Sequence, residues 1–390
     1  MDSLPPELLC IVFAYVRSSV QQRQPAPAAT VVRVCSTWRE VARKLCPELW
    51  TDIRLFHCRS DQLSMFDEYL RLSENLPVDI AMDIPIGTPD MSPLLFRIFR
   101  VSRRWRSLHI STTPEAFRFV RTSGSQIMAP LLESLRLSIS PRMVIHIKSM
   151  PSLKVLVLQD VLLETPGVAS FSPQLEVLDI CSEPGIFQDI THADLLLRLI
   201  AQESGRGSQL RELTLKTTLP RFDGPSGPQL KSYISSVTKL SIGNLDNSAR
   251  THYCLTALQP LLPHATLEEL TLDKLHDGCS RIILANTSFP ALHTLTLSRT
   301  EPVYTETESS PYRDSFPALK HLRLVDLTSY EFIFRVLSET APDRIHWPKL
   351  HTLEIHCNVV PELLRNVVES RVAAGLPLDK LEIHSPQDVD

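Results

Sequence analysis

The sequence is poor in glycine and has no long uninterrupted apolar segment. Only 11 of its 390 residues are glycine, whereas 30 are proline. This balance argues against an enzyme that cradles phosphate groups, because such sites need glycine-rich turns, and it favours many short elements separated by proline. No apolar run approaches the roughly 20 residues of a membrane-spanning helix. The N-terminus also lacks a basic region followed by an apolar run, so we expect no signal peptide.

The motifs of common catalytic and metal sites are also absent. The sequence has no Gly-x-Ser-x-Gly motif, no Walker loop, no Cys-x-x-Cys pair and no His-x-x-x-His pair. Such motifs bring a nucleophile, a phosphate cradle or metal ligands together. The 13 histidines are dispersed, and we expect His351 and His356 on opposite faces of one strand. The sequence therefore predicts a protein that is not an enzyme and that binds no metal and no cofactor.

Charge and cysteine content restrict the partners and the compartment. The formal net charge is −4, so we expect no general attraction to nucleic acid or to an anionic membrane. Arginines cluster within residues 97–106; we interpret them as the solvated face of a helix, with a nucleic-acid patch as the alternative. The eight cysteines are scattered and mostly lie within apolar patterns. Free buried thiols of this kind are typical of a cytoplasmic or nuclear protein.

The first fifty residues predict two amphipathic helices. In the first, apolar residues recur at the spacing of one helix face: Leu8, Ile11, Val12 and Tyr15. A second apolar face of the same helix is formed by Leu9, Phe13 and Val16. A unit of this size cannot bury both faces by itself, so some apolar surface must pack against the rest of the chain or a partner. Periodicity alone fits both a helical cap on a stacked domain and a docking module.

The order of motifs in this region resembles the F-box, the module that attaches a substrate receptor to a cullin-based ubiquitin ligase. Leu4-Pro5-Pro6-Glu7-Leu8 is followed by a helix with Trp38, and then by Leu49-Trp50. The resemblance implies an F-box domain over residues 1–48 that binds a Skp-type adaptor, which in turn binds a cullin. The adaptor-binding residues that it implies are Leu4, Pro5, Leu8, Ile11, Val12, Val34 and Trp38. The Pro- and Gln-rich residues 21–30 depart from the pattern, and we expect them to form a flexible loop.

One pattern, apolar-x-x-Leu-x-Leu/Ile, recurs from residue 105 to the end of the chain. Its eleven units begin at Trp105, Leu132, Leu153, Leu175, Leu210, Val237, Leu267, Leu292, Leu319, Leu350 and Leu378. The mean spacing of about 27 residues lies within the period of leucine-rich repeats. The position nine residues into each unit is usually Asn in such repeats, but here only Asn358 matches. We therefore expect irregular repeats, and the chain resembles fungal F-box proteins with degenerate leucine-rich repeats.

Each unit predicts one strand, because its second and third anchors are two residues apart and point into the core together. Parallel strands need a return path, and amphipathic segments at residues 61–73, 93–101, 192–203, 254–262, 330–340 and 361–374 predict the helices that supply it. With two earlier strands at residues 49–55 and 78–82, we expect about thirteen strands. The expected fold is α/β: an irregular leucine-rich-repeat-like solenoid over residues 49–390, with parallel strands on the concave side and helices on the convex side.

The third, fifth and seventh positions of each unit are expected on the concave face, where a protein substrate could bind. Val155, Val157 and Val177 stand out there as apolar residues, with Arg136 and Asp179 as charged neighbours. The alternative is that a loop covers them. Polar inserts at residues 220–228 and 301–314 are either binding segments or plain loops. The sequence thus predicts a substrate-recognition subunit of a ubiquitin ligase; the alternative is a non-catalytic repeat scaffold whose N-terminal helices only cap the solenoid.

Overall fold

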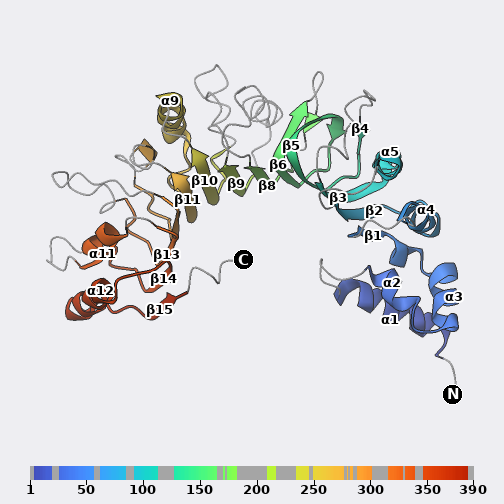
Figure 1. The fold of residues 1–390 in the computed structure, drawn as a ribbon, viewed down its shortest axis with the longest axis horizontal. Coiled ribbons are helices and arrows are strands. Elements are labelled where there is room, and N and C mark those ends of the chain that lie inside the picture. Colours follow the sequence, from blue (N-terminus) through green and yellow to red (C-terminus); the bar gives the residue numbers. More distant parts are fainter. Residues whose placement is uncertain are drawn as a thin grey trace. The chain divides into compact units, whose positions relative to one another are not determined.

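The structure, a computed structural model, describes residues 4–19, 26–56, 62–84, 92–112, 127–164, 170–171, 174–181, 209–216, 234–245, 249–275, 279, 282–283, 288–300, 315–327, 330–338 and 346–384. These residues form an α/β protein with mostly parallel strands and a few helices (Figure 1). They divide into two compact units, residues 1–174 and 175–390. The predicted boundary between residues 48 and 49 lies within the first unit and stays a prediction.

The first unit begins with short helices. They are α1 (Pro6–Ser19), α2 (Pro27–Val31), α3 (Ser36–Leu45) and the 3-10 helix η1 (Pro47–Trp50). The expectation of a flexible loop over residues 21–30 is wrong for residues 27–30, because these residues are helical. Pro27 at the first helical position and the two alanines after it favour a helix, and Pro27 and Ala28 are buried. Residues 20–25 lie outside the described part of the chain.

Parallel strands follow in the first unit. Their order is β1 (Asp52–Leu55), β2 (Val78–Asp83), β3 (Trp105–Thr112), β5 (Ser134–Met150) and β6 (Val155–Glu164). The two-residue strands β4 (Ile127–Met128) and β7 (Ser170–Phe171) pair with β5. The connections from β1 to β2 and from β2 to β3 contain α4 (Gln62–Leu72), and α5 (Ser92–Arg100) with η2 (Ser102–Arg104). Both predicted helices at residues 61–73 and 93–101 are therefore present within a residue or two of their expected bounds.

The second unit continues the same arrangement. Its strands are β8 (Val177–Cys181), β9 (Glu212–Lys216), β10 (Lys239–Leu245), β11 (Glu269–Leu275), β12 (Thr294–Ser298), β13 (His321–Val325), β14 (Thr352–His356) and β15 (Lys380–Ile383). Its helices are α9 (Ala249–Leu258), η4 (Gln259–Leu261), α11 (Glu331–Ser338) and α12 (Pro361–Ala373). The helix expected at residues 192–203 and the inserts 220–228 and 301–314 lie outside the described residues. Within the described residues, no helix combines the length and apolar character needed to cross a bilayer.

The helices of the second unit lie on one side of its strands (Figure 1). We call the opposite side the helix-free face. On it, side chains from neighbouring strands form rows in register, one of which is Lys239, Glu269, Thr294, His321, Thr352 and Lys380. Strands of this unit show alternating half-buried and buried residues, which is the pattern of a sheet with one face in the core and one face near water.

The repeated leucines form the core. In every one of the eleven sequence repeats except the last, all three apolar anchor residues are buried. The second anchor stands in register from strand to strand, for example Leu270 with Leu295 and Leu295 with Leu322. Burying one leucine completely is worth about 1.5–3 kcal/mol, so this row is a large part of the folding free energy. In the last repeat, Leu381 and Ile383 are exposed, because no further strand follows β15 in the described residues.

The chain turns in the same way after several strands. In five of the repeats, the residue two positions after the third anchor has a positive φ: Asp160, Asn244, Lys274, Arg299 and Asp326. The next residue points back into the protein and is buried: Val161, Leu245, Leu275, Thr300 and Leu327. Thr300 donates its hydroxyl to the backbone oxygens of Leu272 and Ser298. An apolar side chain or a threonine therefore occupies the ninth position of these repeats.

Gly243 on β10 leaves space for Asp273 on β11. A Cβ atom at position 243 would lie 2.7 Å from the backbone oxygen of Asp273 and 3.0 Å from its Cβ. The buried Asp273 carboxylate contacts Lys216 Nζ at 3.2 Å and Arg299 Nη2 at 2.9 Å. Burial acts to raise the pKa of Asp273, but the hydrogen bond from Ser298 and the contacts with Lys216 and Arg299 outweigh it, so the pKa lies below its ordinary value. One buried carboxylate thus joins side chains from several strands.

The close approach at Gly243 gives a stability prediction. We expect Gly243→Ala to lower the free energy of unfolding by about 1–3 kcal/mol, because the added Cβ meets backbone that cannot rotate away. Urea unfolding followed by circular dichroism measures this change. Ser241→Ala, on the same strand but half-buried, is the control and should change stability by less than about 0.5 kcal/mol. Equal effects of the two substitutions would contradict the packing described for Gly243.

Candidate functional site

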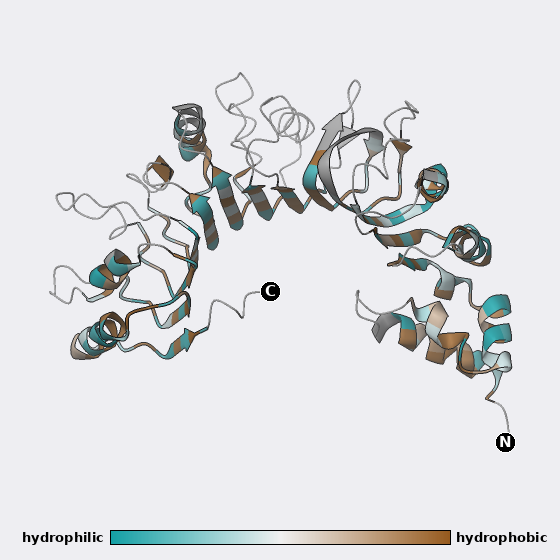
Figure 2. Cartoon of the chain, in the orientation of Figure 1, coloured by the Kyte–Doolittle hydropathy of each residue, from teal (hydrophilic) through white to brown (hydrophobic). Residues whose placement is uncertain are grey.

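Helix α1 has two apolar faces, and only one of them is buried. Leu9 and Phe13 are each 1% exposed, and the ring of Phe13 lies edge-on to Trp38 with 5.3 Å between the ring centroids. The other face is exposed by 46% at Leu8, 65% at Ile11 and 73% at Tyr15. These three residues share one face because they are three and four positions apart. Apolar residues mark α1 in Figure 2, whereas α3 is mostly hydrophilic.

Trp50 joins the N-terminal helices to helix α4. Its indole nitrogen donates a hydrogen bond to the backbone oxygen of Ala42 at 2.8 Å, and its ring lies edge-on to Tyr69 on α4 with 5.1 Å between centroids. Burial, with smaller contributions from nearby acidic groups, raises the pKa of Tyr69 to about 12. Cys10 on α1 and Cys46 ahead of η1 bring their sulfur atoms within 2.9 Å. The inner face of α1 is therefore fixed while its outer face remains at the surface.

The other predicted adaptor-binding residues are exposed to different degrees. Leu4, Pro5 and Val34 are exposed, whereas Val12 and Trp38 are half-buried. Leu45 at the end of α3 is also 57% exposed and was not among the predicted site residues. Several exposed large apolar side chains within one short helical segment are typical of a surface that binds another protein. The sequence signal for this surface was that α1 carries two apolar faces, which a unit of this size cannot bury by itself.

The residues predicted to bind a substrate fall into two groups. Arg136 on β5 pairs in register with Val157 on β6, and Val155 lies two residues earlier on β6. Both valines are half-buried and Arg136 is exposed. The remaining two, Val177 and Asp179, lie on β8 in the second unit and are half-buried. The structure thus brings the first three together, and a role of all five in binding a substrate stays a prediction.

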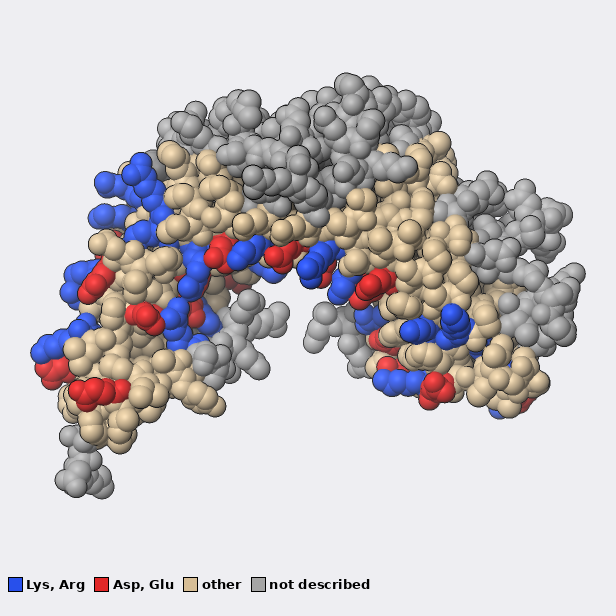
Figure 3. All heavy atoms as spheres, turned by 180° about the vertical axis from the view of Figure 1, so that it is seen from behind, with Lys and Arg blue, Asp and Glu red and all other residues tan. Residues whose placement is uncertain are grey.

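Charged side chains on the sheet are mixed in sign and largely paired. On the helix-free face, Lys239 lies 3.7 Å from Glu212 and 3.3 Å from Glu269. Acidic and basic groups therefore lie side by side instead of forming a patch of one sign (Figure 3). The arginine-rich segment is similar, because Arg104 donates to the backbone oxygen of Leu76 at 3.0 Å and Arg106 binds Asp79 through two nitrogens. Arg104 and Arg106 are thus engaged within the chain, and the interpretation of residues 97–106 as a solvated helix face instead of a nucleic-acid patch stays a prediction.

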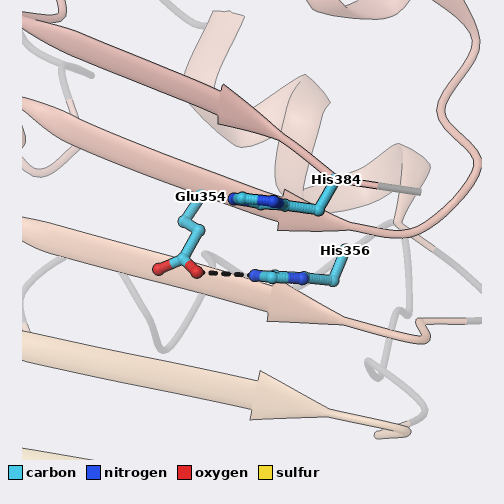
Figure 4. Close-up of side chains that lie close together, drawn as sticks. All are labelled: Glu354, His356 and His384. Atoms are coloured by element: carbon cyan, nitrogen blue, oxygen red, sulfur yellow. Dashed lines mark hydrogen bonds and ion pairs between the residues drawn. The ribbon is translucent and has the colours of Figure 1, made fainter. Parts of the chain in front are cut away.

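A group of ionisable side chains near the C-terminus was missed by the sequence analysis. Nε2 of His356 lies 2.5 Å from Oε1 of Glu354, and the ring of His356 stacks on that of His384 with 4.3 Å between centroids and 7° between planes (Figure 4). The signal was present: Glu354 and His356 are two residues apart on β14, and Ile355 pairs with Ile383, so His384 is next to His356.

The charge environment of this cluster favours an ionised carboxylate. Arg323 Nε lies 3.1 Å from Oε1 of Glu354, and His321 Nε2 lies 3.4 Å from Oε2. Burial acts to raise the pKa of Glu354, but the hydrogen bond with His356 and the charge of Arg323 outweigh it, so the pKa lies below its ordinary value. The cluster therefore holds a carboxylate and several nitrogen atoms at the surface of one sheet.

Comparisons with known proteins add no family assignment. No protein-family model matches the chain, and no curated protein sequence matches it. The resemblances to an F-box and to leucine-rich repeats therefore rest on the residues of this chain and on their arrangement.

Substitutions on the two faces of α1 should differ strongly in their effect on stability. Ile11→Glu should change the free energy of unfolding by less than about 0.5 kcal/mol, because the side chain is at the surface. Phe13→Ala should lower it by about 3–5 kcal/mol, because it leaves a cavity. Unfolding in urea, followed by tryptophan fluorescence, measures both changes close to Trp38 and Trp50. A large loss of stability in Ile11→Glu would mean that the outer face of α1 is buried.

Proposed function

We propose that this protein is the substrate-recognition, F-box subunit of a Skp–cullin–F-box ubiquitin ligase. In this proposal the N-terminal helices bind a Skp-type adaptor and the repeats bind a protein substrate. The proposed architecture is a helical F-box followed by an irregular leucine-rich-repeat-like solenoid, with strands on the concave side. The observation that carries the proposal is the exposed apolar face of α1, formed by Leu8, Ile11 and Tyr15.

The burial pattern of α1 supports docking over capping. A helix that only closed the end of a stack would bury its apolar residues against that stack. In α1, Leu9 and Phe13 already provide the contact with the rest of the unit, whereas Ile11 is 65% exposed. Large apolar side chains at a helix surface lower solubility unless a partner covers them. The outer face is therefore better explained by a partner than by the fold of this chain alone.

The repeats support a binding surface made of many strands. Parallel strands in register place side chains from successive units in rows, and the row that contains Lys239 and Glu269 shows this arrangement. Such a surface can contact a protein along several units at once, and stacked repeats are widely used as extended binding surfaces. The mixed charges of the rows favour a substrate surface of mixed charge over a strongly acidic or basic one.

The proposed mechanism is proximity. The adaptor links the receptor to a cullin that carries a ubiquitin-charged enzyme, and the receptor holds a substrate lysine close to the reactive thioester. Holding two reactants together raises their effective concentration without any catalytic group on the receptor. The chain would then supply orientation, and the chemistry would belong to the charged enzyme. This division fits a sequence without nucleophile or phosphate-binding motifs.

Adaptor binding is the direct test. We expect a tagged chain, co-expressed with a Skp-type adaptor from the same organism, to elute from size exclusion as a 1:1 complex. Leu8→Glu should abolish this complex, because it places a charge in an apolar contact. Leu131→Glu is a matched control: Leu131 is 47% exposed and Leu8 is 46% exposed, but Leu131 lies outside the helical segment. The control should bind like the unchanged chain.

Two outcomes of this experiment would contradict the proposal. A chain that elutes alone in every case would favour the scaffold whose N-terminal helices only cap the repeats. A complex that persists in Leu8→Glu, or that is lost equally in Leu131→Glu, would show that the adaptor does not use the outer face of α1.

The predicted substrate patch gives a second test. We expect Val157→Asp to reduce the capture of substrate by the purified complex, since it adds a charge beside Arg136 in the predicted contact. Proteins retained from a lysate of the same organism are compared by quantitative mass spectrometry, with adaptor recovery as the internal control. Unchanged capture in Val157→Asp would remove this patch from the proposed surface while leaving adaptor binding intact.

A further inference from the structure

The cluster around Glu354 brings together side chains that bind metal ions. Glu354, His356 and His384 each offer one ligand atom, and these three atoms all lie within 4.8 Å of one another. Within the residues that the structure describes, no other group of three histidine, cysteine, aspartate or glutamate side chains comes as close. The three residues come from the end of β14 and from the position just after β15 (Figure 4).

We propose that Glu354, His356 and His384 form a binding site for a divalent transition-metal ion of the zinc class. Two imidazole nitrogens and one carboxylate oxygen are a ligand set that zinc accepts, whereas magnesium and calcium prefer oxygen ligands alone. Three protein ligands leave a coordination position open to water or to a partner side chain. The site is separate from α1 and does not depend on the proposed adaptor role.

The state of His356 supports a ligand role. Its side chain is only 7% exposed, and its Nδ1 atom is buried without a hydrogen-bond partner. A buried imidazole whose hydrogen-bonding capacity is only partly used is costly. A metal ion would bind Nε2, the ring nitrogen that faces Glu354, and would hold the ring in place.

Binding requires a small rearrangement of the ligands. Two donors on one tetrahedral zinc ion lie about 3.3 Å apart, given zinc–ligand distances of about 2.0–2.1 Å. Nε2 of His356 and Oε1 of Glu354, now 2.5 Å apart, must therefore separate so that an ion can bind both. An ion must also lie near the plane of each ring that binds it, so the ring of His384 must turn out of its parallel stack on His356. His384 is half-buried and follows the last strand, so its side chain has room to turn.

Arg323 opposes metal binding and provides the most specific test. Its guanidinium lies 3.1 Å from Glu354 Oε1 and 3.4 Å from His356 Nε2, where it occupies the cation position beside the carboxylate. Because the Arg323 side chain is 43% exposed, it can swing into solvent when an ion binds. Removing its positive charge should therefore strengthen metal binding, whereas in a cluster that is only an ion-pair network it would merely remove a contact.

Metal titration of the full chain tests the proposal. After treatment with a chelator, we expect one Zn²⁺ per chain by isothermal titration calorimetry, and a Co²⁺ spectrum that lacks thiolate charge-transfer bands. His384→Ala should weaken binding at least about tenfold, since even changes outside the ligand shell cost about 10–100-fold. Arg323→Gln should tighten it. His351→Ala is the matched control, because it removes a histidine near β14 that is not part of the cluster, and it should bind like the unchanged chain.

The set of variants separates the proposal from its alternatives. A gain of affinity in Arg323→Gln cannot come from misfolding, so it supports the site even if a ligand variant is unstable. Absence of one-to-one binding in both the unchanged chain and Arg323→Gln would overturn the proposal. Equal losses in His384→Ala and His351→Ala, or thiolate bands in the Co²⁺ spectrum, would also overturn it, because the ion would then be bound elsewhere.

Discussion

The fold depends on the burial of one repeated row of leucines. A strand with apolar residues at alternate positions can bury them only if the next strand presents the same positions in register. The pairing of Leu270, Leu295 and Leu322 in consecutive strands satisfies this condition. The tight turn with positive φ after several strands returns the chain to the core, and the buried residue after this turn closes the end of those repeats. Where the row stops, at β15, Leu381 and Ile383 are exposed.

Much of this arrangement could be predicted from periodicity, and the failures have physical reasons. The strands, their parallel pairing and several helices followed from the spacing of apolar residues. Helix α2 was missed because prolines and glutamines around residues 21–30 suggested a loop, although Pro27 followed by alanines favours a helix. The cluster of Glu354, His356 and His384 was missed because two of its members are close only through the register of β14 and β15. Register is a property of the folded sheet, so a search for local motifs does not detect it.

The two proposed sites use different surfaces of the chain. The outer face of α1 is apolar and lies in the first unit, whereas the metal ligands lie among the charged side chains of the second unit. An apolar face gives affinity through the removal of water, while the polar face of a sheet gives specificity through charge and hydrogen bonding. The two proposals therefore rest on different residues and on different kinds of contact. Because of this, each proposal can fail without the other.

The central claim is that the outer face of α1 is exposed in the free chain and covered in the complex. Hydroxyl-radical footprinting with mass spectrometry measures this directly, residue by residue. We expect strong labelling of Leu8, Ile11 and Tyr15 in the free chain, loss of that labelling when the adaptor binds, and weak labelling of Leu9 and Phe13 in both states. Weak labelling of Tyr15 in the free chain, or labelling that the adaptor leaves unchanged, would contradict the claim.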